Sequence, residues 1–429
     1  MKRKRIVGWT SAILLAFPFV YREADWLWPG AKPVDAAKAQ SGKDLFQHEW
    51  TPNDPLANGG DGLGPVFNAK SCVECHRQGG AGGSGPFETN VNVFTIRPKG
   101  EGRFLVAKAR QGVVHTQAVL SEFQETFAHV SPALPANFPP LSNAGVLPAN
   151  GVRGLTMPQG VNLSQRKTPA LFGAKLIDEI PDRDIIANER IEYLKWGLAT
   201  PQERGRVPIG RVMRMADGRI GRFGWKAQTV SLVEFVRAAC ANELGLGNPG
   251  QAQPQPLGYP AYQTVGFDLT LAQCDQLAEF IRSLPRPFER LPAEPEAMTQ
   301  AKAGKSLFGS VGCADCHIPD VGSVRGLYSD LLLHEMGEDL EGGGDYNDRP
   351  LDEPAFTPGT GPLPAEWRTP PLWGVARSAP YLHDGRAATL DEAIRLHGGQ
   401  GKNSAQRYTS LAQYERDQLV AFLKTLEMP

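Results

Sequence analysis

The chain has 429 residues, too many for one ordinary domain, and this length predicts two or three domains. Its 45 Lys and Arg residues nearly balance 46 Asp and Glu residues, which excludes the overall basic field that holds nucleic acid. Glycine (47) and proline (36) are abundant and predict much irregular backbone, while six cysteines are too few for a disulfide-rich scaffold.

The N-terminus has the pattern of an export segment. Basic residues occupy positions 2–5, and an apolar run follows from Ile6 to Val20. This run is shorter than a membrane-spanning helix and is typical of a secretory signal or a short uncleaved anchor. We therefore expect residues 1–39 to direct the protein to the periplasm. Cleavage and retention as a membrane anchor both remain open.

Two pentapeptides of the form Cys-x-x-Cys-His carry most of the chemistry. Their members are Cys72, Cys75 and His76 in the first, and Cys313, Cys316 and His317 in the second. Two thiols at this spacing can form thioethers with the vinyl groups of one haem, and the adjacent His then becomes an axial ligand of the iron. A zinc site would need both Cys pairs to converge, and a thioredoxin-like dithiol would need a βαβ context. The motifs predict two covalently bound c-type haems.

Segments around the two motifs are repeated along the chain. The matching stretches are AKAQSGKDLF at 37–46 with AKAGKSLF at 301–308, TPALFG at 168–173 with TPPLWG at 369–374, and LAQCDQLAEFIRSLP at 271–285 with LAQYERDQLVAFLKTL at 411–426. Apolar residues of the last pair recur at the spacing of an amphipathic helix. Each half therefore has an opening helix, a haem motif, a middle segment and a closing helix.

This repeat predicts a mainly α fold of two tandem cytochrome-c-like helical domains. Both domains should be rich in loops, and each should hold one covalent haem. We place the N-terminal domain, with insertions, at residues 40–285, a linker at 286–300 and the C-terminal domain at 301–429.

Alignment of the halves predicts different surroundings for the two irons. Setting Leu232 against Leu390 places Ala239 opposite His397. An iron that gains His397 as a second imidazole is saturated and suits electron transfer, whereas an iron that faces Ala239 can bind a small molecule. The alternative for His397 is an exposed residue at a helix C-terminus.

Other side chains compete as axial ligands. Met336 is a second candidate for the C-terminal haem, and the candidates for the distal side of the N-terminal haem are His115, His129, Met157, Met213 and Met215. Most of these residues have an ordinary alternative as core or surface side chains.

Two further residues are candidates for catalysis. Trp225 stands in the first half where His383 stands in the second, and it is either a core aromatic or an oxidisable ring between the haems. Glu243 lies four residues after Ala239. It is either a solvated helix residue or a general acid at the open iron, where burial would raise its pKa.

Two cysteines and one acidic stretch remain. Cys240 and Cys274 form an even leftover pair, which predicts a disulfide in an oxidising compartment, with two separate buried thiols as the alternative. The stretch Glu338–Glu366 is rich in Gly, Pro and acidic residues and predicts a solvated loop. Docking of a basic electron donor is its alternative role.

Several longer stretches together resemble the bacterial di-haem cytochrome c peroxidase superfamily, and most closely its branch of di-haem or thiol oxidoreductases. They are FNAKSCVECHRQGGAGGSGP, GRFGWKAQ, YSDLLLHEMG, EWRTPPLWG and APYLHDGRAATLDEAIRLHGG. The resemblance runs from about residue 40 to the C-terminus. It implies that the C-terminal haem transfers electrons and that the N-terminal haem reduces hydrogen peroxide.

The resemblance also implies roles for single residues. His397 stands where relatives have a Met or Tyr ligand, which implies a bis-His centre, and Trp225 best matches the Trp between the haems. Glu243 is only a loose match to the relatives' distal Glu, because their Asn-Pro-x-Glu-Met run is absent. Relatives bind an interdomain calcium through carbonyls that match Ser378 and Pro380, but Lys167 replaces their Asn ligand.

We therefore expect an exported di-haem oxidoreductase of the peroxidase type. Electrons should come from a small redox protein or cytochrome, enter at the C-terminal haem and pass by way of Trp225 to the N-terminal haem, where peroxide or another small oxidant is reduced. A pure electron-transfer cytochrome is one alternative. An oxygenase or cofactor-modifying enzyme is the other.

Overall fold

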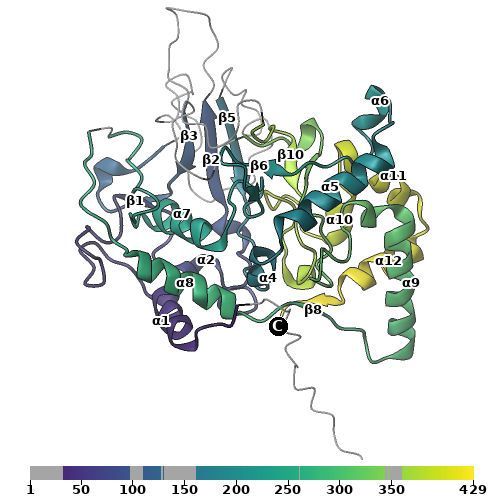
Figure 1. Cartoon of the computed structure of the whole chain (residues 1–429), viewed down its shortest axis with the longest axis horizontal. Helices are drawn as coiled ribbons and strands as arrows, with labels where there is room; N and C mark the ends of the chain where they lie inside the picture. The colour runs from purple at the N-terminus through teal and green to yellow at the C-terminus, as the bar shows by residue number, and fades with distance from the viewer. Residues whose placement is uncertain are drawn as a thin grey trace, which may run out of the picture. The chain divides into compact units, whose positions relative to one another are not determined.

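Most of the regular secondary structure is helical, and long irregular segments connect the helices (Figure 1). The computed structural model describes residues 32–96, 110–126, 129, 161–259, 261–343, 346 and 360–429. Most of the expected export segment lies outside these residues. Within them, none of the helices combines the length and the apolar character that a membrane crossing requires. Residues Val34–Pro429 form one unit, and the description below concerns this unit.

Most of the helices and strands are short. The α-helices are α1 (Ala36–Gln47), α2 (Cys72–Cys75), α4 (Ala174–Asp178), α5 (Asp182–Trp196), α6 (Pro201–Arg204), α7 (Leu232–Leu244), α8 (Leu271–Ser283), α9 (Pro295–Val311), α10 (Leu390–Arg395), α11 (Lys402–Ser410) and α12 (Gln413–Leu423). The 3-10 helices are η1 (Phe87–Thr89), η3 (Ser121–Phe123), η4 (Cys313–Asp315), η5 (Glu338–Leu340), η6 (Val375–Arg377) and η7 (Gly399–Gly401). The helical fold class is confirmed in this coarse sense.

The strands are few, and all of their pairings are antiparallel. The central strand β2 (Val91–Ile96) pairs with β3 (Arg110–Val114) on one side and β5 (Val161–Arg166) on the other. The two-stranded pairs are β1 (Val66–Phe67) with β4 (Gln117–Ala118), β6 (Met213–Arg214) with β7 (Ile220–Gly221), β8 (Phe288–Glu289) with β11 (Leu426–Glu427), and β9 (Leu333–Glu335) with β10 (Glu366–Arg368). The three-stranded sheet belongs to the longer first half, and sequence reasoning missed it.

Each half is built on one pair of packed helices, as the repeat predicts. Helix α1 packs on α8, and α9 packs on α12 (Figure 1). A Cβ atom on Gly42 would lie 1.8 Å from the carbonyl oxygen of Gln276, and one on Gly304 would lie 1.9 Å from that of Gln418. Only glycine allows the backbones to approach so closely. The repeated sequence therefore specifies the same helix crossing twice.

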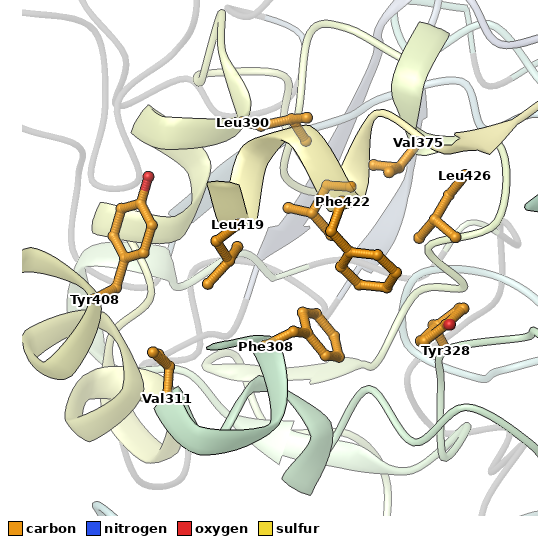
Figure 2. Packing of buried hydrophobic residues seen from close by; sticks show 10 residues of the cluster. Phe308, Val311, Tyr328, Val375, Leu390, Tyr408, Leu419, Phe422 and Leu426 are labelled. Atoms are coloured by element: carbon orange, nitrogen blue, oxygen red, sulfur yellow. The ribbon is translucent and has the colours of Figure 1, made fainter. Parts of the chain in front are cut away.

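Aromatic side chains pack between the helices of both pairs. In the second half the rings of Phe308 and Phe422 lie 5.4 Å apart, and both contact Tyr328 from the loop after the second haem motif (Figure 2). In the first half Phe46 and Phe280 make the equivalent contact at 5.0 Å. The aromatic pair therefore fixes the helices and, in the second half, also anchors the loop that follows the haem motif.

A tight turn precedes α7 in the first half and α10 in the second. The bridging residues of the two turns are Phe223 with Thr229 and Tyr381 with Ala387. The two turns also share a left-handed backbone at aligned positions, since φ is +81° at Gly224 and +70° at Leu382. Trp225 and His383 consequently occupy equivalent places in the two halves.

The two halves exchange hydrogen bonds at these turns. The backbone N–H of Lys167 donates to the carbonyl of His383 at 2.7 Å, and the N–H of Arg368 donates to the carbonyl of Trp225 at 2.9 Å. Lys167 and Arg368 each precede a repeated Thr-Pro segment, so the repeat relates the two bonds. The rings of Trp225 and His383 meet edge to face with their centroids 6.5 Å apart. Trp225 therefore lies where the two halves interlock.

The segment 286–300, which we expected to be a linker, takes part in the fold. Strand β8 in this segment pairs with β11 at the C-terminus, and α9 already begins at Pro295. Pairing with the last strand ties the connection to the second half.

Replacing Gly304 with alanine should destabilise the protein by about 2 kcal/mol, because the new Cβ must displace the backbone of Gln418. Gly309→Ala is a matched control on the same helix. A Cβ there meets no atom within 4 Å, so the higher helix propensity of alanine should raise stability by up to about 1 kcal/mol. Thermal unfolding of both variants measures the difference. Equal shifts of Tm would contradict the close helix crossing.

Candidate haem centres and their distal residues

The first haem motif forms one helical turn followed by a buried imidazole. The N–H of His76 donates to the carbonyl of Cys72 at 3.0 Å, which places both thiols of α2 on the same turn. His76 Nδ1 lies 3.2 Å from the carbonyl oxygen of Gly83. With Nδ1–H donating to this carbonyl, Nε2 is left for an iron. Burial lowers the pKa of His76 to about 4, which keeps the imidazole in the neutral form that binds metal.

The second haem motif repeats this geometry in η4. The N–H of His317 donates to the carbonyl of Cys313 at 3.0 Å, and Nδ1 of His317 lies 2.9 Å from the carbonyl oxygen of Tyr328. Burial lowers the pKa of His317 to about 4 as well. Both motifs therefore fit a covalently attached haem with a neutral proximal His.

The alternative of a zinc site shared by both Cys pairs finds no support in the described part of the chain. There, the group of side chains whose ligand atoms lie close enough to hold a metal is Cys316 with Asp330 and His334, without a second Cys. Burial raises the pKa of Cys72 and of Cys313 to about 12, which disfavours the thiolate that zinc requires. The separation of the two pairs instead suits one haem per motif.

His397 lies close to the second haem motif. A charge on His397 would lower the pKa of His317, after the larger effect of burial, which places the two imidazoles within electrostatic reach. His397 Nδ1 lies 2.8 Å from the carbonyl oxygen of Ala393, an arrangement that leaves Nε2 for the iron. Ligation by His397 stays a prediction that this geometry favours.

Met336, the competing ligand, lies beside His397. A Cβ atom on Gly401 would be 3.1 Å from Cβ of His397 and 3.2 Å from Cε of Met336. The structure thus brings both candidates to the same side of the second motif, although they come from segments about 60 residues apart.

The aligned helices α7 and α10 begin where the repeat predicts. Hydroxyl groups cap both, from Ser231 at α7 and from Thr389 at α10. Helix α10 ends before His397, whereas α7 continues past Ala239 to Leu244. The longer α7 carries Glu243 onward to the first haem motif.

Glu243 is a buried carboxyl group near this first motif. Burial raises the pKa of the Cys75 thiol, and the nearby Glu243 carboxylate raises it further. Asn68 Nδ2 donates to Oε2 of Glu243 at 2.9 Å, while Oε1 is buried and has no hydrogen-bond partner of good geometry among the described residues. Burial also raises the pKa of Glu243 itself. A buried carboxyl group with a raised pKa fits a proton donor.

Tyr346 covers the same place from the second half of the chain. Its ring stacks on Phe235 of α7 with centroids 5.5 Å apart, and its carbonyl accepts from Asn242 Nδ2 at 2.7 Å. Burial and the neighbouring Glu243 carboxylate raise the pKa of the Tyr346 phenol well above its usual value. The prediction that Glu338–Glu366 is only a solvated loop is therefore wrong at Tyr346. The one available signal was an aromatic residue in an acidic stretch.

His115 is already engaged through both of its ring nitrogens. Nδ1 lies 2.9 Å from Oε2 of Glu125, and Nε2 lies 2.8 Å from the carbonyl oxygen of Asn242. Burial would lower the pKa of His115, but the Glu125 carboxylate raises it overall. The His115 imidazole links Glu125 to Asn242, the residue before Glu243. Because both of its ring nitrogens have partners, His115 is a poor candidate for an axial ligand.

The other proposed distal ligands of the first haem lie elsewhere. Met213 and Met215 pack in a hydrophobic cluster with Ala227 and Leu333. His129 is exposed, and its Nδ1 accepts from the N–H of Thr126 at 3.2 Å. Met157 lies outside the described residues.

Trp225 and Trp367 differ in their electrostatic surroundings. The indole N–H of Trp225 donates to the carbonyl of Lys167 at 2.8 Å. Trp367 stacks on His383 at 3.6 Å, and the central carbon of the Arg166 guanidinium lies 4.6 Å from the centroid of its ring. A cation on the ring face stabilises the neutral indole of Trp367 and opposes its oxidation.

The residue expected to replace a calcium ligand gives no support for a calcium site. Lys167 is buried, and Nζ donates to the carbonyl of Thr168 at 3.4 Å. Burial lowers the pKa of Lys167 to about 8. An ammonium group offers no lone pair to a calcium ion.

The disulfide predicted between Cys240 and Cys274 is not formed in this structure and stays a prediction. Cys240 on α7 and Cys274 on α8 are free, buried thiols. Burial raises the pKa of Cys240 well above its usual value, with further contributions from Cys72 and Cys274, and burial raises the pKa of Cys274 to about 11. Cys240 therefore packs toward the first haem motif, while Cys274 contacts Arg237. The structure therefore holds the alternative arrangement, in which Cys240 and Cys274 are two buried thiols.

Comparison with known proteins gives consistent matches. Residues 149–426 match a family model described as "Di-haem oxidoreductase, putative peroxidase". The chain is 31% identical over 261 residues to the methylamine utilization protein MauG of Methylorubrum extorquens, covering 54% of this chain and 70% of MauG. It is also 31% identical over 170 residues to the cytochrome-c peroxidase IdrP1 of Denitromonas iodatirespirans, covering 33% of this chain and 44% of the peroxidase.

A structural match is more distant. Hydrazine synthase of Kuenenia stuttgartiensis aligns over 99% of this chain and 100% of its own, with 16% sequence identity and a TM-score of 0.41. This likeness is too weak to carry an argument about the site.

Alkylation of the denatured, haem-loaded protein without reductant should label two thiols, Cys240 and Cys274, because the other four cysteines are held as thioethers. Mass spectrometry of the peptides identifies the labelled sites. Cys240→Ala should reduce the count to one. If neither thiol is labelled before reduction and both are labelled after it, the two cysteines form the predicted disulfide.

Proposed function

Because the chain belongs to the di-haem oxidoreductase family and is thus an oxidoreductase, we propose that it reduces peroxide with electrons from a small redox protein. The observation that carries the proposal is the contrast between the two haem motifs. The buried carboxyl group of Glu243 lies near the first motif, whereas the additional imidazole of His397 lies near the second. The first arrangement suits proton delivery to a bound oxidant and the second suits electron transfer.

The side chains that would hold two c-type haems are available in both halves. They are Cys72, Cys75 and His76 for the first haem, and Cys313, Cys316, His317 and His397 for the second. Bound haem supplies the iron chemistry of peroxide reduction and of electron storage. The residues of the chain decide where protons and electrons reach it.

Glu243 is the proposed proton donor at the first site. Its raised pKa favours the protonated carboxyl, and Asn68 Nδ2 donates to Oε2 at 2.9 Å. Protonation of the departing oxygen lowers the barrier to O–O cleavage, because water then leaves in place of hydroxide. Tyr346 shields this proton from bulk solvent by stacking across α7.

Trp225 is the proposed electron relay between the halves. It lies at their interlock, bound to Lys167 through its indole N–H and to Arg368 through its carbonyl. Trp367 is disfavoured as a relay, because the Arg166 guanidinium, whose central carbon lies 4.6 Å from the centroid of its ring, opposes loss of an electron. The charge distribution therefore directs transfer through Trp225.

Two aspects of the proposal rest on family membership. Export to the periplasm is expected because c-type haem is attached outside the cytoplasm, and the basic, apolar N-terminus suits export. The match that covers 70% of MauG favours a cofactor-modifying enzyme as the second candidate function. In that case the same open site would act on a different substrate.

Glu243→Gln should lower kcat/KM for hydrogen peroxide by about 10²-fold or more, because the amide cannot donate the proton. In the unchanged enzyme, activity should fall as the pH rises through the raised pKa of Glu243, since the carboxyl then loses its proton. The variant should lose this limb of the profile. Glu234→Gln on the same helix is the control. The test is peroxide turnover with a reduced donor, and full activity of Glu243→Gln would contradict the role.

His397→Ala should convert the second haem from low spin to high spin, because one strong ligand is lost. Optical and EPR spectra of the oxidised protein report this change, and they should be repeated after one-electron reduction. Met336→Leu is the matched variant and should leave the spectrum unchanged. The opposite pattern would assign the ligand to Met336.

A further inference from the structure

Helix α5 buries Ile185 and Glu192, but towards its C-terminal end it also exposes large apolar side chains to solvent. On the inner side Glu192 is 5% exposed, and Asn188 Nδ2 donates to the carbonyl of Asp330 at 3.0 Å. On the outer side Ile191 and Leu194 are 60% and 77% exposed, and Leu198, just past the helix end, is fully exposed. The spacing of these three residues, i, i+3 and i+7, aligns them in one stripe. We call Ile191, Leu194 and Leu198 the α5 stripe.

The α5 stripe lies next to the second haem motif. Lys195 Nζ is 2.5 Å from Oδ1 of Asp315, the residue immediately before Cys316. The buried face of the same helix reaches strand β9, since Glu192 Oε1 lies 3.8 Å from His334 Nε2. Only the thickness of one helix, about 10 Å, separates the stripe from these residues.

Positive charge surrounds the stripe. Among the exposed charged side chains from 190 to 206, apart from the ion-paired Lys195, three are arginines (Arg190, Arg204 and Arg206) and one is acidic, Glu203. The Glu203 carboxylate accepts from the N–H and hydroxyl of Thr200, and these hydrogen bonds lower its pKa, so it stands as one negative charge beside three positive ones. The rim is therefore complementary to an acidic partner.

We propose that the α5 stripe and its arginine rim form the docking surface for a small acidic electron-transfer protein. Exposed apolar patches rimmed by charge mark interaction sites, and a small patch of this kind suits a transient redox complex. The inference rests on the proposed function in one respect, the entry of electrons at the second haem motif. The reduced partner loses one electron to this haem, and no atoms are exchanged.

The probe is a small acidic c-type cytochrome, added in its reduced form to the haem-loaded protein. Leu194→Ser with Leu198→Ser should raise the Kd of the complex and lower the second-order rate of haem reduction by about tenfold or more. The matched control is Leu120→Ser with Val265→Ser, because Leu120 and Val265 are 52% and 55% exposed. Both variants should be reduced by dithionite as fast as the unchanged protein.

Charge provides the second arm of the test. Arg204→Glu with Arg206→Glu should weaken binding of the acidic cytochrome at low salt and flatten its dependence on ionic strength. A basic cytochrome of similar size should bind the unchanged protein more weakly than the acidic one. Preferential binding of the basic cytochrome, or equal losses in the Leu120/Val265 control, would overturn the proposal.

Other occupants of the surface have their own signatures. Self-association of the unchanged protein that the Leu194/Leu198 variant abolishes would assign the stripe to a second copy. Binding to anionic vesicles that the same variant abolishes would assign it to a membrane. Either result overturns the proposal. Peroxide turnover with a small-molecule electron donor does not need the docking surface. If the unchanged protein shows no such turnover, the proposed function is contradicted and the docking proposal is not.

Discussion

The arrangement of this protein depends on a reciprocal exchange of backbone hydrogen bonds between its two halves. Lys167 donates to the turn that carries His383, and Arg368 donates to the turn that carries Trp225. Each bond links the segment before a repeated Thr-Pro to the turn of the other half. Neither half can supply both partners, so the contact forms only when both are folded.

In the proposed function, the same backbone arrangement serves two different chemical purposes in the two halves. The turns, the helix starts and the glycine crossings are equivalent. The helices after the turns differ in length, and this difference alone carries Glu243 toward the first motif while leaving His397 beyond the end of α10. A modest change of helix length thus separates a site suited to proton delivery from one suited to electron transfer.

Local patterns predicted the repeated parts well. The two haem motifs, the helix pairs and the aligned starts of α7 and α10 follow from spacing and caps, which act over a few residues. Glu243 was also found from the repeat alignment. The three-stranded sheet was missed, because its strands pair across long insertions that have no counterpart in the second half. The pairing of Cys240 with Cys274 stays a prediction, since counting cysteines says nothing about where each thiol points.

By itself, the sequence determined the chemistry of attachment: Cys-x-x-Cys-His and the surrounding helical periodicity are local and need no distant partner. Only the tertiary structure decided which side chains surround each motif. Tyr346 reaches Glu243 from more than 100 residues away, and α5 turns Leu194 outward while burying Glu192. Such choices depend on which surfaces the fold brings together, and contacts between distant segments leave no periodic signal in either one.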